Sequence, residues 1–196
     1  MTGKVTGYSS TQIALHWAVV VLVAFQFVAH DGIESAWRNQ LRGAPDSADV
    51  RLLAYMHIAG GLLILLLALI RLWLRFTRGA PAPPADEPRL MQLFAEGIHW
   101  LIYLMLLLLP ATGLIAWFLG VRLAGEAHEA MKNILLGAIV LHVAGALFQH
   151  FIRRSHVLMR MLRPEAPPEG AGSQVSFDRI NATMKPSAVE SGPEPR

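Results

Sequence analysis

The sequence predicts an all-α fold, an integral membrane four-helix bundle with both termini in the cytoplasm. Hydrophobic residues make up 54% of the 196 residues and charged residues only 16%. The charges crowd into short segments and leave four long apolar stretches between them. Each stretch is long enough to cross a bilayer, which takes about 20 mostly apolar residues. The chain is therefore expected to have the lipid bilayer as its surroundings.

The four spans can be placed from the limits of the apolar stretches. A helix-capping box is expected ahead of the first span, because Ser9 precedes Gln12 by three residues. Pro110 is expected to kink the third span. The first span is expected to be retained, since its apolar run is longer than that of a signal peptide. The expected spans are Thr11–Ala29, Leu52–Phe76, Leu90–Leu119 and His128–Ile152.

The segments between and after the spans are expected to be connections and a tail. The connections are Asp31–Arg51, Thr77–Arg89 and Gly120–Ala127. Residues 1–163 would form one transmembrane domain. Residues 164–196 are rich in Pro, Gly, Ser and charge, which predicts a disordered cytoplasmic tail with at most a brief surface helix over Val175–Met184.

The basic residues predict the orientation of the bundle. One Lys precedes the first span, four Arg lie from Arg71 to Arg89, and seven Lys or Arg follow from Arg153 onward. These segments share one side of the membrane, and only five basic residues lie elsewhere. Cytoplasmic loops are enriched in Lys and Arg, so both termini are expected to be cytoplasmic.

Composition also excludes some chemistry. The chain has no cysteine, which excludes disulfides, thiolate ligation of iron–sulfur clusters and the covalent attachment of c-type haem. Any haem would be held non-covalently. A net charge of +3 is modest, and we expect no nucleic-acid partner.

Histidines are concentrated in the expected spans. A polar side chain in hydrocarbon is costly, so each is a functional candidate. A single such histidine could simply bond to a neighbouring helix, but six in four spans favour a common function. The six are His16, His57, His99, His128, His142 and His150.

The spacing of these histidines favours two haems in two layers. His128 and His142 are 14 residues apart, about 40° short of four full turns and about 21 Å apart along one helix face. By depth, His57 is the partner of His128 near the outer surface. His16 is the partner of His142 near the cytoplasmic surface, although depth also allows His99. Two neutral imidazoles saturate haem iron and favour electron transfer over oxygen binding.

Three further residues are candidates near the cytoplasmic surface. Arg71 follows His57 by 14 residues, so its guanidinium could contact a haem propionate or a quinone oxygen. The alternative is that Arg71 only reaches the headgroups. His99 and His150 could bond quinone carbonyls and pass protons, or could be interfacial residues without such a role.

The residues around these positions resemble the bacterial cytochrome b561 family, which is related to the cytochrome b subunits of nickel–iron hydrogenases. The similarity covers about Tyr8 to Pro164, and the order of the motifs together with the histidine spacing is specific. The matching segments are Tyr8–Trp17, Met56–Gly61, Arg71–Arg75, His99–Tyr103, Leu109–Leu114, Ala127–Ala130 and Leu141–His142.

The resemblance implies two haem b groups, an inner-membrane location and ubiquinone as electron acceptor. Members of that family are described as superoxide oxidases, which oxidise periplasmic superoxide and reduce ubiquinone. The implied activity is therefore that of a superoxide:ubiquinone oxidoreductase. The segment from Asp31 to Arg51 holds three Arg but four acidic residues, so it gives little electrostatic support for capture of an anion. Some relatives carry adjacent histidines where this chain has Gln149-His150.

Two alternatives remain open from the sequence. The chain could be a cytochrome b subunit that passes electrons between quinone and a periplasmic partner enzyme or redox protein. It could instead be a haem-free proton or metal-ion carrier that uses its intramembrane histidines. A visible spectrum of the purified protein would distinguish the second alternative.

Overall fold

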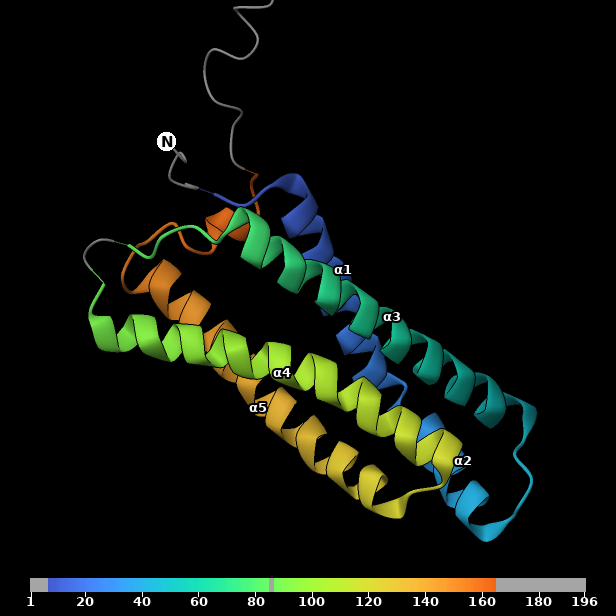
Figure 1. Ribbon diagram of the computed structural model, residues 1–196. Coiled ribbons are helices and arrows are strands. Elements are labelled where there is room, and N and C mark those ends of the chain that lie inside the picture. Colours follow the sequence, from blue (N-terminus) through green and yellow to red (C-terminus); the bar gives the residue numbers. More distant parts are fainter. Residues whose placement is uncertain (1–6, 85–86, 165–196) are drawn as a thin grey trace, which may run out of the picture. The chain divides into compact units, whose positions relative to one another are not determined.

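The computed structural model describes residues 7–84 and 87–164. This part of the chain is helical and contains no strand. Four of its helices are long and apolar enough to cross a membrane, which confirms the expected all-α, four-span architecture. The elements are α1 (Ser10–Val28), α2 (His30–Arg42), α3 (Ala48–Arg78), α4 (Arg89–Leu119), α5 (Arg122–Phe151) and the 3-10 turn η1 (Met159–Met161) (Figure 1). The tail from residue 165, including the short helix expected over Val175–Met184, lies outside the described residues.

The start of α1 is set by the capping box that the sequence predicts. The Gln12 backbone N–H donates to Ser9 Oγ at 3.3 Å, and the Ser9 N–H donates to Gln12 Oε1 at 3.0 Å. Each bond satisfies a donor that has no partner within the helix. The first span thus begins within a residue of its expected start.

Helix α5 begins earlier than expected. The connection after α4 is not the predicted Gly120–Ala127, because α5 already starts at Arg122. Gly120 ends α4 with a left-handed backbone (φ 66°), a conformation that glycine adopts without steric cost. The extra turns of α5 contain Arg122 and Glu126 and are polar, so hydropathy alone does not detect them. Pro110 lies inside α4, which continues past it.

Helix α2 is the element that the sequence reading missed. The segment 31–51 was expected to be a connection, yet most of it is the 13-residue helix α2 followed by the start of α3. The helix is too short and too polar to span a bilayer. Its apolar residues Ile33, Ala36, Trp37 and Leu41 recur at helical spacing, which is the pattern of an amphipathic helix.

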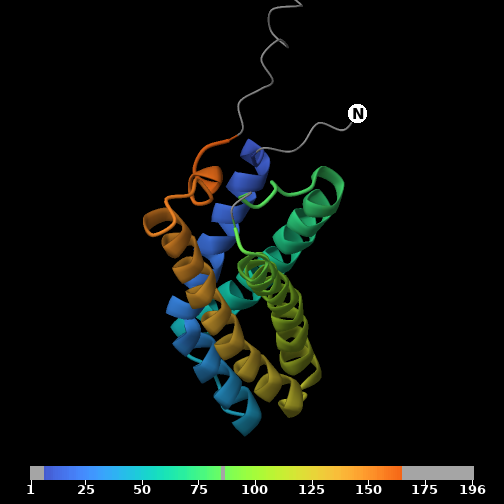
Figure 2. The ribbon, with the colours of Figure 1, turned by 90° about the vertical axis from the view of Figure 1, so that its left-hand side faces the viewer.

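The spans enclose a small apolar core and leave most of their surface for lipid. Helix α4 packs against α5, and α3 packs against α1, α2 and α4 (Figure 2). In an 18-residue apolar stretch of each span, only 11% to 22% of the residues are buried, as expected where the surrounding solvent is hydrocarbon. The buried residues at the centre are Val19, Val23, Ile64, Ala68, Met105, Leu106, Leu109 and Leu135.

The two ends of the bundle differ, and we name them the α2 end and the η1 end. At the η1 end, α1 and α4 begin and α3 and α5 end (Figure 1). The segment after α5 folds back here, because Trp17 Nε1 donates to the Met161 carbonyl at 3.0 Å and Arg160 donates to the Ala82 carbonyl at 2.7 Å. At the α2 end, Gln40 of α2 donates to the Trp117 carbonyl of α4 at 3.0 Å.

Candidate functional site

Four of the expected site histidines form two facing pairs. His57 on α3 faces His128 on α5, with ring centroids 6.2 Å apart. His16 on α1 faces His142 on α5, with ring centroids 6.3 Å apart. Helix α5 therefore contributes one imidazole to each pair, at the two levels that the 14-residue spacing predicts.

Both separations fit a metal ion held between two imidazoles. A metal–imidazole bond is about 2.0 Å, so two nitrogens on opposite sides of one ion are about 4 Å apart and the ring centres about 6 Å apart. His99 is much nearer to His142, with ring centroids 4.9 Å apart and ring planes at 80°. That spacing is too short for an ion between the two rings. His16 therefore fits as the partner of His142 better than His99 does.

The His128 ring is oriented by its backbone contact. Its Nδ1 lies 2.9 Å from the Leu109 carbonyl, which also accepts from Thr112 Oγ1 at 3.0 Å. A carbonyl only accepts, so the proton is on Nδ1 and Nε2 has a free lone pair for a metal. Gly113 allows this approach, since a Cβ there would lie 3.1 Å from His128 Nδ1.

A cavity of about 930 Å³ surrounds the His57–His128 pair at the α2 end. Its size lies within the range of cofactor-binding pockets, about 300–1,000 Å³. Its walls are mainly apolar and come from α1 to α5, and the glycines Gly61, Gly113 and Gly125 line it. A flat macrocycle between helices requires such space, so the cavity and the imidazole pair fit the same kind of ligand.

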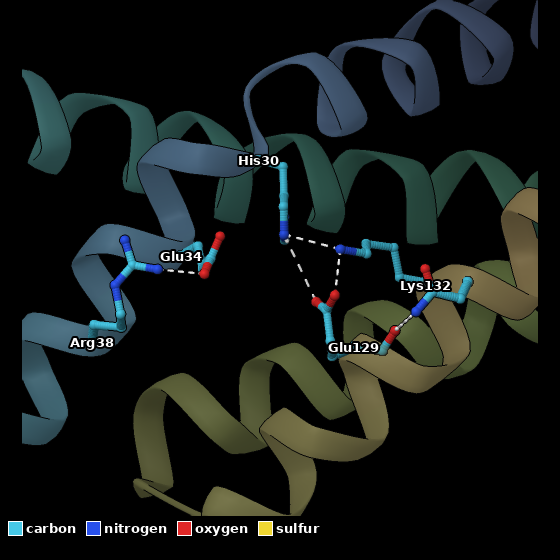
Figure 3. Close-up of polar contacts among 6 residues, drawn as sticks. His30, Glu34, Arg38, Glu129 and Lys132 are labelled. Atoms are coloured by element: carbon cyan, nitrogen blue, oxygen red, sulfur yellow. Dashed lines mark hydrogen bonds and ion pairs between the residues drawn. The ribbon is translucent and has the colours of Figure 1, made fainter.

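Ionisable side chains from α2 and α5 are among the residues that line this cavity, and Figure 3 shows the polar contacts between them. Lys132 Nζ lies 3.0 Å from His30 Nε2 and 2.5 Å from Glu129 Oε1. On α2, Arg38 is paired with Glu34. Each of these two cations thus has a carboxylate beside it.

Sequence reasoning gave His30 no role at this site. It considered Lys132 only as a place to seek the quinone if the quinone does not depend on His99 or His150. Lys132 follows His128 by four residues, so the two share a face of α5. That four-residue spacing could have indicated that Lys132 lies near the imidazole of His128. His30 had no comparable signal, because the helix that carries it was not expected.

Arg71 lies at the level of the second imidazole pair. It is within electrostatic range of His16, His99 and His142. Its Nη1 is buried and has no hydrogen-bond partner within residues 7–84 and 87–164, which leaves a donor for an anionic or carbonyl oxygen.

Aromatic residues surround the arginines at the η1 end. The Arg71 guanidinium lies 6.0 Å from the centre of the Tyr103 ring, and that of Arg75 lies 5.3 Å from the centre of the Trp100 ring. Tyr8, just before α1, is also close to Arg75, and burial raises the pKa of its phenol. Tyr8 stays a hydrogen-bond donor at neutral pH. Sequence reasoning did not select it, because it lies outside the spans.

The remaining candidates, His99 and His150, have different surroundings from each other. His99 Nδ1 bonds to the Ala95 carbonyl at 2.6 Å, so its Nε2 is free to accept. His150 has a ring contact with Phe151 at 4.9 Å. No ring contact joins His150 to another histidine in the described ranges, whereas His99 is brought beside His142.

Four spans with two imidazole pairs on a shared helix form the arrangement of a membrane-bound b-type cytochrome. Comparison with known proteins agrees. The family model described as prokaryotic cytochrome b561 matches residues 7–164, and the chain belongs to this family.

Three relatives illustrate the similarity. Cytochrome b562 of Cereibacter sphaeroides is 34% identical over 161 residues, covering 81% of this chain and 96% of the relative. A protein of Yersinia pestis named "Probable superoxide oxidase CybB" is 28% identical, and the match covers 79% of this chain and 95% of that relative. Cytochrome b561 homolog 1 of Escherichia coli is 27% identical, and the match covers 79% of this chain and 96% of the relative.

Family membership gives the general function. The protein is a multi-pass bacterial membrane protein that transfers electrons, and the family implies haem b as its cofactor. The paired imidazoles and the cavity at the α2 end fit that cofactor.

Proposed function

We propose that the protein carries electrons across the bacterial inner membrane through two b haems, oxidising periplasmic superoxide and reducing ubiquinone. The observation that carries the proposal is the pair of imidazole separations, 6.2 and 6.3 Å, at two levels of α5. Haem iron supplies one-electron chemistry when bound between two imidazoles. The described part of residues 1–163 would be the transmembrane di-haem domain.

Each residue has a defined role in this proposal. His57 and His128 hold one haem at the α2 end. His16 and His142 hold the other toward the η1 end. With two imidazole ligands a bound haem iron would have no open coordination position, which would favour electron transfer over oxygen binding.

The direction of transfer follows from the basic residues. The positive-inside count supports an orientation with the η1 end in the cytoplasm and the α2 end in the periplasm. Electrons from a periplasmic donor would therefore enter between His57 and His128 and leave toward His142 and Arg71.

The stoichiometry of the reaction requires proton donors near the η1 end. Two superoxide ions lose one electron each and become two molecules of oxygen, while one ubiquinone gains both electrons and two protons. Arg71 would hold a quinone oxygen or a propionate through its unpartnered Nη1. His99, whose Nε2 is free to take up a proton, and His150 would pass protons on to the quinone.

A second function remains a candidate because of the charges beside the cavity. Lys132 and Arg38 are paired with Glu129 and Glu34, and this pairing weakens their attraction for superoxide. A cytochrome b subunit that exchanges electrons with a periplasmic redox protein would not need an unpaired cation there. Family membership, which implies haem b, argues against the haem-free proton or metal carrier.

Sequential-mixing stopped-flow spectroscopy tests the proposed reaction. The purified protein is mixed first with superoxide and then with a soluble ubiquinone, and haem absorbance is followed. We expect superoxide to reduce the wild-type protein and ubiquinone to re-oxidise it. His150→Ala or His99→Gln should slow re-oxidation, because each removes a side chain that passes protons to the quinone, while reduction by superoxide stays nearly unchanged.

The same experiment separates the alternatives. If superoxide fails to reduce a protein that dithionite reduces, the donor is a partner protein instead. If both variants are re-oxidised at the wild-type rate, the quinone does not depend on His99 or His150. The quinone would then have to be sought at the α2 end, near Arg51 or Lys132.

A further inference from the structure

Two residues that contact each other at the α2 end each have a buried polar atom without a hydrogen-bond partner among the described residues. These atoms are Nδ1 of His57 on α3 and Oε1 of Gln26 on α1. The Gln26 amide is fixed beside His57, because its Nε2 donates to the His57 backbone carbonyl at 2.9 Å. Both residues line the same cavity.

One of the two atoms is a donor and the other an acceptor. When Nε2 of a neutral imidazole binds a metal, the proton is on Nδ1, and a metal-bound histidine almost always donates that proton to an acceptor. The opposite ligand already has its acceptor, since His128 Nδ1 bonds to the Leu109 carbonyl at 2.9 Å. His57 Nδ1 has no such bond to any residue that the structure describes, and the unpartnered oxygen of Gln26 is an acceptor on the neighbouring helix.

We propose that Gln26 is a positioning residue for His57, and that its Oε1 accepts the His57 Nδ1 proton through one ordered water. The inference rests on the proposed function, in which His57 is a haem ligand. A buried water needs at least two polar partners, and these two atoms supply them. The bond would set the ring orientation of His57 and make its Nε2 a stronger donor to iron.

Gly60 provides the space that the Gln26 amide occupies. A Cβ at Gly60 would lie 2.8 Å from Gln26 Nε2, closer than real Cβ contacts, whereas a Cβ at Gly61 would lie 3.7 Å away, in ordinary contact. Alanine at position 60 would therefore displace the amide from the His57 carbonyl. Gly60→Ala and Gln26→Leu should then affect the same hydrogen bond by different routes.

The bond predicts a change in reduction potential. A more electron-rich imidazole stabilises ferric iron more than ferrous iron, so loss of the acceptor should raise the midpoint potential of the haem at His57. A tenfold change in the ratio of ferric to ferrous affinity corresponds to about 59 mV for one electron. Gln26→Leu should raise this potential, and Gln26→Glu, which keeps an acceptor oxygen, should leave it at or below the wild-type value.

The test is a spectroscopic redox titration of the full-length protein with both haems bound. The haem between His16 and His142 serves as the internal reference. The inference predicts that only the haem at the α2 end shifts, upward in Gln26→Leu and not upward in Gln26→Glu. An unshifted potential in Gln26→Leu would overturn it, as would equal upward shifts in both variants or equal shifts of both haems.

Gly60→Ala provides an independent measurement should Gln26→Leu fail to fold. It should raise the same potential, and it should have no further effect when combined with Gln26→Leu, because both remove one bond. Additive shifts would contradict the inference. A wild-type protein that binds no haem between His57 and His128 would instead contradict the proposed function.

Discussion

At the residue scale, spacing and depth predict the histidine pairs, with His99 left open as a partner of His142. They do not predict which groups surround each ring. A 14-residue separation on one helix fixes the face that His128 and His142 share. Their partners could be ordered by depth because each span crosses the membrane once. Which group orients each ring depends on contacts between helices, as for the Leu109 carbonyl beside His128. Gln26 could have been selected from the sequence, because it is an amide side chain in an apolar span, where a polar group is costly unless it is paired.

The ligand assignment can be tested one imidazole at a time. His57→Ala or His128→Ala should remove the haem signal of the α2 end, and His16→Ala or His142→Ala that of the other level, because loss of a ligand leaves iron weakly held. Low-spin ferric signals in electron paramagnetic resonance measure each site separately. His156→Ala is the control, since this side chain lies beyond the spans. Two intact signals in His128→Ala would refute the assignment.

At the element scale, prediction succeeded where length and hydropathy determine the outcome. Four long apolar helices must form in a bilayer, because only internal hydrogen bonds satisfy the backbone there. Helix α2 was missed because its stability comes from packing against its neighbours. Gly32 is buried against Leu53 of α3, and Trp37 lies against Gly125 of α5. Such contacts cannot be read from a local sequence pattern.

The packing of α2 on α3 makes a specific prediction. A Cβ at Gly32 would lie 2.4 Å from Leu53 Cβ, so Gly32→Ala should push α2 off α3 and open the cavity. Overpacking of this kind costs about 1–3 kcal/mol. The haem at the α2 end should then transfer faster to apomyoglobin, as followed by absorbance. Gly97→Ala on α4 is the control, because a Cβ there meets nothing within 4 Å. Equal transfer rates in the two variants would show that α2 does not retain this haem.

At the scale of the whole molecule, α5 connects the two sites. It contributes His128 to one pair and His142 to the other, and a core of buried apolar residues lies in the bundle with them. The fold class and the number of spans could be predicted, because both follow from the bilayer. The cavity at the α2 end could not be predicted. Residues from five helices line it, and the sequence does not predict one of these helices, α2.

The most direct test of the central claim is the haem content of the purified protein. Pyridine haemochrome analysis identifies haem b, and amino-acid analysis of the same sample gives the protein concentration. Two imidazole pairs, each at the spacing of a bis-histidine site, predict about two haems b per chain. A clear value of one haem per chain, in protein that loses no haem during purification, would contradict the account of two haems at two levels.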